Sequence, residues 1–125
     1  MVKKVLVVSK SKGVEGKSSI PRIRICGKWL VPLGFVPDKF VSVSCKNEFI
    51  ELQLEKPDID FSRIRSKNGF LKVGRSNNKT SIGFSPIIYI RGYWLNDIGF
   101  AIGAIVLVNC DSAKITIQLI KHDGL

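Results

Sequence analysis

Residues 21–35 read PRIRICGKWLVPLGF, and residues 86–100 read PIIYIRGYWLNDIGF. The two stretches align at a shift of 65 residues, and from residue 21 to residue 54 the alignment runs without a gap over 34 positions, 14 of them identical. Two copies of so small a unit are too few for a solenoid, and each copy alone buries little core. The halves are therefore expected to close on each other. The predicted layout is a first repeat at 1–60, a connector at 61–65 and a second repeat at 66–125, together one compact domain.

Alternating hydrophobic residues predict β-strands in both repeats. The run Arg22-Ile23-Arg24-Ile25 places its isoleucines on one face of an extended chain, toward the core, and its arginines on the other. Residues 28–34 follow, with room for only about two helical turns. Pro32 inside that segment predicts a short or irregular helix. The expected strands are 5–8, 22–25, 40–45 and 50–54, repeated at 70–73, 87–90, 105–110 and 115–119.

Each repeat thus reads as strand, basic loop, strand, short helix, strand, turn and strand. Gly34 and Gly99 stand where a left-handed residue is expected to end each helix. Trp29 and Leu30 are assigned to the apolar face of the first helix, toward the core. The sequence predicts a mainly β protein with short helices.

Positive charge is concentrated at the start of each repeat. The chain carries a net charge of +10; residues 1–28 hold eight basic residues and one acidic residue, and residues 63–91 hold seven and none. Such blocks are typical of a surface that faces a polyanion, although a solvated face that only keeps the protein soluble is the alternative. Because the blocks recur in both copies, we expect them to merge into one face. The candidate phosphate contacts are Lys10, Lys12, Lys17, Arg22, Arg24, Lys28, Arg75, Lys79 and Arg91.

The pattern Pro-x-Ile-x-Ile-x-Gly-x-Trp-Leu-x-x-x-Gly-Phe, preceded by a basic strand and loop, resembles the SymE family of bacterial toxins. The second repeat departs from it at Tyr93, where the family has a basic residue, and family members usually carry one copy and pair between chains. The resemblance implies an AbrB-like swapped-hairpin barrel, formed here by two tandem ββαββ repeats as an intrachain pseudodimer. The matching residues of the first repeat are Pro21, Gly27, Lys28, Trp29, Leu30, Gly34 and Phe35.

The same resemblance implies the toxin of a type I toxin-antitoxin system, which binds RNA and cleaves it as an endoribonuclease. An AbrB-like DNA-binding regulator, or a nucleoid-condensing protein without catalysis, is the alternative. A module that binds only other proteins is a third hypothesis. RNA or DNA is thus the expected partner.

The residues themselves support binding more than catalysis. Ribonuclease chemistry commonly uses a general acid and base, for which Glu15, Lys17 and the arginines are the candidates, and no convincing pair emerges. The segment Gly13-Val14-Glu15-Gly16-Lys17-Ser18 lacks the first glycine of a P-loop, so nucleotide hydrolysis is not expected. His122 stands alone in the C-terminal tail without a second ligand at metal-binding spacing. No cofactor and no metal are predicted.

Two further features bear on partners and compartment. Arg22 and Arg24 are replaced in the second repeat by Ile87 and Tyr89. Together with Ile105 and Leu107, these residues predict an apolar face for self-association or a partner protein; Tyr89 as a base-stacking platform is the alternative.

The three cysteines lack the spacing of a disulfide framework. Cys45 and Cys110 are interpreted as small core residues, and a reducing cytoplasm is the expected compartment. The apolar run within the first eight residues is too short for the core of a signal peptide or for a membrane span, so no membrane partner is expected.

Overall fold

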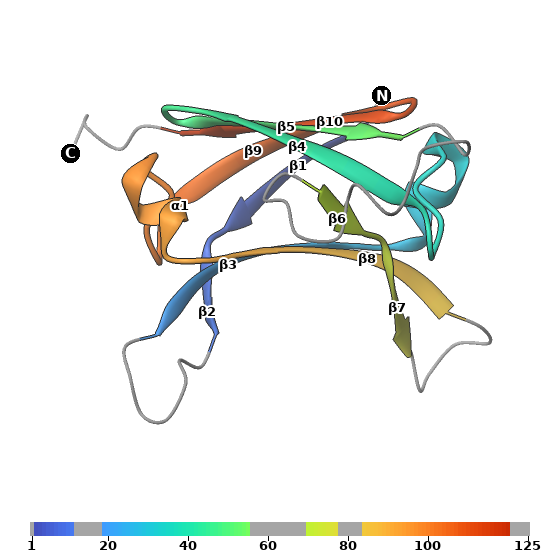
Figure 1. The fold of residues 1–125 in the computed structure, drawn as a ribbon, viewed down its shortest axis with the longest axis horizontal. Helices are drawn as coiled ribbons and strands as arrows, with labels where there is room; N and C mark the ends of the chain where they lie inside the picture. The colour runs from blue at the N-terminus through green and yellow to red at the C-terminus, as the bar shows by residue number, and fades with distance from the viewer. Residues whose placement is uncertain (1, 12–18, 56–69, 78–83, 121–125) are drawn as a thin grey trace.

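The computed structural model describes residues 2–11, 19–55, 70–77 and 84–120. Within them the chain forms two antiparallel β-sheets that face each other across a hydrophobic core, with a short helical segment in each half (Figure 1). The expectation of a mainly β fold is confirmed. The elements are β1 (Val2–Val7), β2 (Ser9–Ser11), β3 (Ile20–Cys26), η2 (Lys28–Leu33), β4 (Phe40–Lys46), β5 (Phe49–Leu54), β6 (Phe70–Lys72), β7 (Gly74–Asn77), β8 (Phe84–Arg91), α1 (Trp94–Asp97), β9 (Ile105–Asp111) and β10 (Lys114–Leu119).

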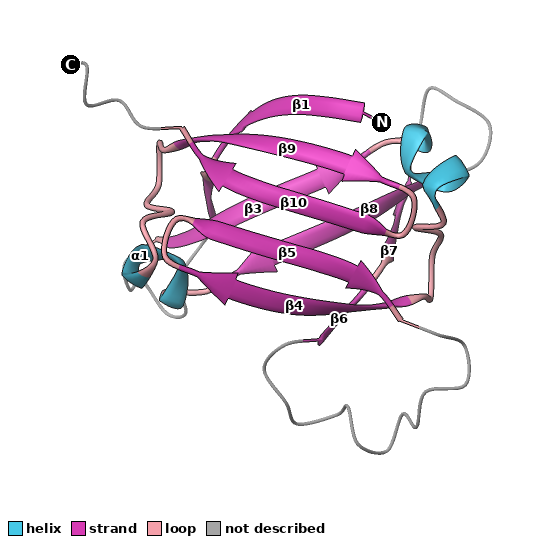
Figure 2. Cartoon of the chain, turned by 90° about the horizontal axis from the view of Figure 1, so that it is seen from above, coloured by secondary structure: helices cyan, strands magenta, loops and turns pink. Residues whose placement is uncertain are grey.

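The larger sheet has the strand order β1-β9-β10-β5-β4-β6, and the smaller has the order β2-β3-β8-β7. The long strands of the larger sheet lie over β3 and β8 and cross them (Figure 2). Several strand pairs join residues of the first half to residues of the second: β1 with β9, β3 with β8, β5 with β10 and β4 with β6. The core therefore draws on both halves.

The pairing registers relate the two halves by a pseudo-two-fold axis. In the smaller sheet Arg24 lies opposite Tyr89, and in the larger sheet Glu51 lies opposite Thr116. Both pairs join positions separated by the repeat shift of 65 residues. The flanking pairs obey the same relation, because Leu6 lies opposite Val106 while Leu71 lies opposite Val41. The axis thus passes between β3 and β8 and between β5 and β10.

The first strand of each repeat differs from the expectation of one short strand. The chain forms β1 and then β2, with the break at Val8, and likewise β6 and β7 with the break at Val73. Val8 is buried, its N–H donates to the Ala104 carbonyl at 2.8 Å, and its carbonyl accepts from Gly103 at 2.8 Å. Here the chain leaves one sheet and enters the other. The apolar run before Val8 contains no polar break that would have revealed this crossing.

The Gly-x-Trp motif has a steric reason. Gly27 has φ +151°, and a Cβ placed on it would lie 2.2 Å from Nε1 of Trp29. Gly92 repeats this arrangement with φ +157° and 2.3 Å to Nε1 of Trp94. Each glycine also binds the other half, because the Gly27 N–H donates to the Pro86 carbonyl at 3.2 Å, and the Gly92 N–H donates to the Pro21 carbonyl at 3.2 Å. The proline and glycine of the motif therefore meet across the pseudo-two-fold axis.

The helical segments are as short as the sequence predicts. The first is a 3-10 helix that contains Pro32, and the second is a single α-helical turn. Gly34 follows the first with φ +98°, and Gly99 follows the second with φ +97°, so both are left-handed as expected. Leu30 and Leu95 point into the core and are fully buried.

The two cysteines expected in the core have different environments. Cys110 is fully buried, as predicted, whereas Cys45 is exposed, so that part of the prediction is wrong. Val2 of β1 pairs directly with Cys110, while the described part of β6 pairs only with residues 40–42 of β4. Burial, reinforced by the neighbouring Asp111 carboxylate, raises the pKa of the Cys110 thiol to about 11.

This difference predicts an order of thiol reactivity. In the folded protein at pH 8, iodoacetamide should modify Cys45 and leave Cys110 unmodified, because Cys110 is both inaccessible and protonated at that pH. Peptide mapping by mass spectrometry measures the modification of each site, with a sample in denaturant as the control in which both react. Equal native rates at the two sites would contradict the assigned burial.

Candidate nucleic-acid interface

The outer face of the smaller sheet carries the arginines that the alternation predicted. Arg22 lies opposite Arg91, and Arg24 lies opposite Tyr89. The intervening isoleucines point the other way and form core: Ile23, Ile25 and Ile90 are each 1% exposed and Ile88 is 0% exposed. Arg24, Tyr89 and Arg91 are exposed and Arg22 is partly exposed. We call these four residues, Arg22, Arg24, Tyr89 and Arg91, the arginine face.

Arg22 is held by contacts to both neighbouring strands. Its Nε donates to Oγ of Ser9 on β2 at 3.3 Å, and Ser9 Oγ donates back to the Arg22 carbonyl at 3.1 Å. On the other side, its guanidinium carbon lies 5.4 Å from the ring centroid of Tyr89 on β8. This is cation–π distance. The contacts orient one cation beside an aromatic ring that is itself 44% exposed, a combination suited to phosphate and base.

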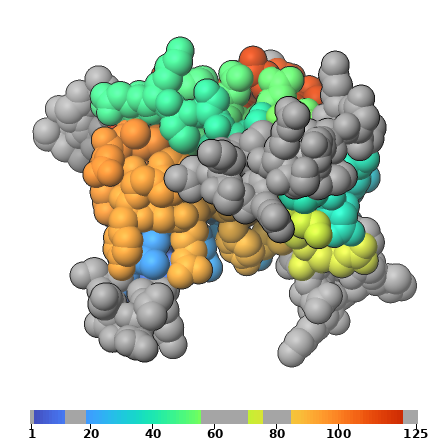
Figure 3. Space-filling model, viewed as in Figure 1, coloured from blue at the N-terminus to red at the C-terminus, as the bar shows by residue number. Residues whose placement is uncertain are grey.

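The arginine face is flanked by β2 and β7, which extend below the body of the protein on either side of it (Figure 1). In the space-filling view, residues of the blue β3 and orange β8 segments form the lower surface of the body, and the yellow β7 segment lies beside it (Figure 3). Lys10 of β2 and Arg75 of β7 occupy equivalent places, opposite Pro21 and Pro86. Cationic residues therefore stand on the face and on both of its flanking strands.

The charge of the β7 flank is partly balanced. Nη2 of Arg75 lies 4.0 Å from Oδ2 of Asp38, and Nζ of Lys72 lies 3.5 Å from Oδ1 of the same carboxylate. All of these side chains are more than half exposed, and such pairs contribute about 1 kcal/mol or less. A polyanion can therefore compete for these cations at small cost.

The nine predicted contacts fall into three groups. Arg22, Arg24 and Arg91 are brought together on the arginine face, and Lys10 and Arg75 lie on the flanking strands. Lys28 begins η2, after Gly27 at the far end of β3, and is exposed. Lys12, Lys17 and Lys79, and the catalytic candidate Glu15, lie outside the described residues.

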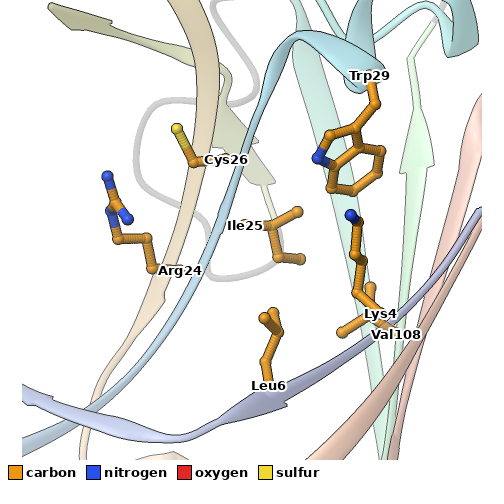
Figure 4. Close-up of a pocket in the computed structure, with 7 residues that line it drawn as sticks. All are labelled: Lys4, Leu6, Arg24, Ile25, Cys26, Trp29 and Val108. Carbon is orange, nitrogen blue, oxygen red and sulfur yellow. The ribbon is translucent and has the colours of Figure 1, made fainter. Parts of the chain in front are cut away.

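Sequence reasoning missed a cavity at the seam between the two sheets. It has a volume of about 250 Å³ and lies between β1 and β3, next to η2 (Figure 4). Nζ of Lys4 lies 5.5 Å from the Trp29 ring centroid, and Arg24 links the cavity to the arginine face. The sequence offered only a weak signal for it, because Lys4 is one of many lysines and Trp29 has the spacing of a core residue. Its main lining residues are Lys4, Leu6, Arg24, Ile25, Cys26 and Trp29.

The four apolar residues expected to share one face lie on different sheets. Ile87 and Tyr89 belong to β8 in the smaller sheet, and Ile105 and Leu107 belong to β9 in the larger. Ile87 is only 5% exposed, so it contributes little surface. The Tyr89 ring instead joins the arginine face, where base stacking was the alternative role. Ile105 and Leu107 pair with Val7 and Val5, which are 59% and 63% exposed.

Comparisons of the chain with protein-family models, curated proteins and solved structures found no match. In the described part of the chain, no helix has the length and apolar character needed to cross a membrane. Over the same residues, no cluster of three or more histidine, cysteine or carboxylate side chains is arranged to hold a metal ion.

Proposed function

We propose that this chain is a nucleic-acid-binding protein of the SymE-like type, with two tandem ββαββ repeats folded as an AbrB-like swapped-hairpin barrel within one chain. The exchange of strands between halves supports this fold, because β1 extends the sheet at β9 and β6 extends it at β4. The pseudo-two-fold registers at Arg24–Tyr89 and Glu51–Thr116 support the pseudodimer.

RNA is the proposed ligand, and the arginine face is the observation that carries the proposal. Three arginines project from two adjacent strands, and one of them lies 5.4 Å from the exposed Tyr89 ring. Arginines neutralise backbone phosphates, and an exposed ring stacks on an unpaired base, which is how single strands are commonly bound. A face that served solubility alone would not need Arg22 to be oriented by both Ser9 and Tyr89.

For the activity, we propose a cytoplasmic toxin of a type I toxin-antitoxin system with endoribonuclease action. The resemblance of the repeated motif supports cleavage, while the described geometry supports binding. The arginines of the face could stabilise the negative charge that develops on a phosphate during transesterification. Glu15 and Lys17 remain the candidate acid–base residues.

A DNA-binding regulator without catalysis is the second candidate, and one observation favours it. The pseudo-two-fold axis passes through the arginine face, between Arg24 and Tyr89. Duplex DNA has its own two-fold axes, and dimeric regulators align their symmetry with them. A pseudodimer could do the same with one chain.

The test compares labelled single-stranded RNA and duplex DNA in binding and time-course gels with chelator present. We expect saturable RNA binding, RNA fragments that accumulate with time, and loss of both when Arg22 and Arg24 are replaced by alanine. Saturable duplex binding without cleavage would support the second candidate instead. If neither polymer binds at low salt, both candidates are wrong.

A further inference from the structure

The cavity between β1 and β3 has a chemical character of its own. Two of the residues that line it, Lys4 and Arg24, are cationic, with the Arg24 side chain on the other side of β3 from Lys4 and Trp29 (Figure 4). None of the described residues that line it is acidic. Trp29 supplies a flat aromatic wall, with Nζ of Lys4 at 5.5 Å from its ring centroid (Figure 4). Leu6, Ile25 and Val108 complete an apolar floor. A ligand that matches this lining has both a flat ring and a negative charge.

The volume limits the ligand to a small one. Pockets for drug-sized molecules have volumes of about 300 to 1,000 Å³. At about 250 Å³ this cavity falls below that range. A single flat base is small enough for that volume, and the phosphate of the same nucleotide would then lie outside the cavity.

The residues that line the cavity differ between the two repeats. Under the repeat shift of 65 residues, Arg24 corresponds to Tyr89 and Cys26 corresponds to Arg91. Lys4 corresponds to Gly69, which has no side chain to supply a cation and lies outside the described residues. Only the first repeat therefore has the residues for this lining. A ligand that uses the cavity binds in one orientation, unlike a symmetric duplex.

Arg24 belongs both to the cavity and to the arginine face. A strand whose phosphates lie along the arginine face therefore reaches Arg24, which the cavity shares. We propose that the cavity binds the base of one unpaired nucleotide of an RNA strand, beside Trp29 and Lys4, while the phosphate of that nucleotide lies outside the cavity at Arg24. This inference rests on the proposed RNA-binding function and adds to it a specific place, the cavity, where one unpaired base is recognised.

The test uses two short RNA duplexes that differ only by a single-nucleotide bulge. Wild-type protein should bind the bulged duplex about tenfold more tightly, since stacking of one base on an aromatic side chain contributes about 1–3 kcal/mol. Lys4→Ala should abolish most of this preference and leave affinity for the fully paired duplex nearly unchanged. Fluorescence anisotropy with labelled RNA measures both affinities.

Lys3→Ala is the matched control. Lys3 precedes Lys4 on β1, where it lies opposite Asn109 of β9, and its side chain is exposed. Because side chains alternate along a strand, Lys3 lies on the face of the larger sheet that points away from the cavity. The variant loses the same charge but should keep the preference for the bulge. In a Trp94→Phe background, which leaves Trp29 as the single tryptophan, the bulged duplex should also quench fluorescence more strongly than the paired one.

The outcomes separate this inference from the function on which it rests. Equal wild-type affinity for the two duplexes, or an equal loss of preference in the Lys3 and Lys4 variants, would overturn the cavity assignment while RNA binding stands. Binding to neither duplex, and to no single-stranded RNA, would overturn the proposed function itself and this inference with it.

Discussion

Simultaneous replacement of Arg22 and Arg24 by alanine is expected to lower RNA affinity at least about a hundredfold, because each charge-assisted hydrogen bond contributes about 1.5–3 kcal/mol. Both guanidinium groups project from β3 on the face away from the core, so their loss leaves the buried isoleucines in place. The slope of log K against log salt concentration should also become shallower by about 1.4–1.8, because each of the two lost phosphate contacts contributes about 0.7–0.9 to that slope. Titrations at several salt concentrations measure both quantities.

The control for that experiment removes two lysines from the opposite side of the molecule. Lys3 and Lys46 are exposed on the larger sheet, at the ends of β1 and β4. Lys3→Ala with Lys46→Ala changes the net charge by the same amount as the arginine pair. It should reduce affinity by only the small, salt-sensitive effect of overall charge. If the two double variants weaken binding equally, binding depends on total charge and the arginine face is not the site.

Much of the fold could be predicted because its signals are local. The alternation in residues 22–25 fixed which side chains face the core, and the glycines that end the short helices marked a backbone conformation that glycine favours. Internal repetition then indicated that the halves close together. The split of the first strand at Val8 could not be predicted, since it depends on bonds to Gly103 and Ala104, about a hundred residues further along the chain.

The candidate site shows the same division between local and long-range information. Alternation and charge sufficed to predict Arg22 and Arg24, because their exposure follows from strand geometry alone. The cavity was missed because it brings Lys4 beside Trp29 only when β1 crosses to pair with β9. Cys45 was assigned to the core because it and Cys110 occupy equivalent apolar strand positions, yet among the described residues only Cys110 has a second strand paired beside it, at Val2.

The second large effect concerns stability and the Gly-x-Trp motif. Gly27→Ala should destabilise the protein by about 2–6 kcal/mol, combining about 1–3 kcal/mol for a backbone conformation that is essentially confined to glycine with about 1–3 kcal/mol for overpacking. The added methyl group would occupy the position that lies 2.2 Å from Nε1 of Trp29, so the ring must move. Moving the ring disturbs Leu30 and the bond from Gly27 to Pro86 of the other half. Urea denaturation followed by far-ultraviolet circular dichroism measures the change.

Gly103→Ala separates steric overlap from backbone strain. Gly103 also has a positive φ, +93°, but no described atom lies within 4 Å of the place that an added methyl group would take, so its replacement should cost only the backbone share of about 1–2 kcal/mol. A third variant combines Gly27→Ala with Trp29→Ala and so removes the overlap. Gly27→Ala should therefore cost less stability in the Trp29→Ala background than in the wild-type protein. Equal destabilisation in the Gly27 and Gly103 variants would show that backbone strain alone explains the glycine. A larger loss at Gly27, reduced in the double variant, would establish that packing of the Trp29 ring over glycine is what the motif requires.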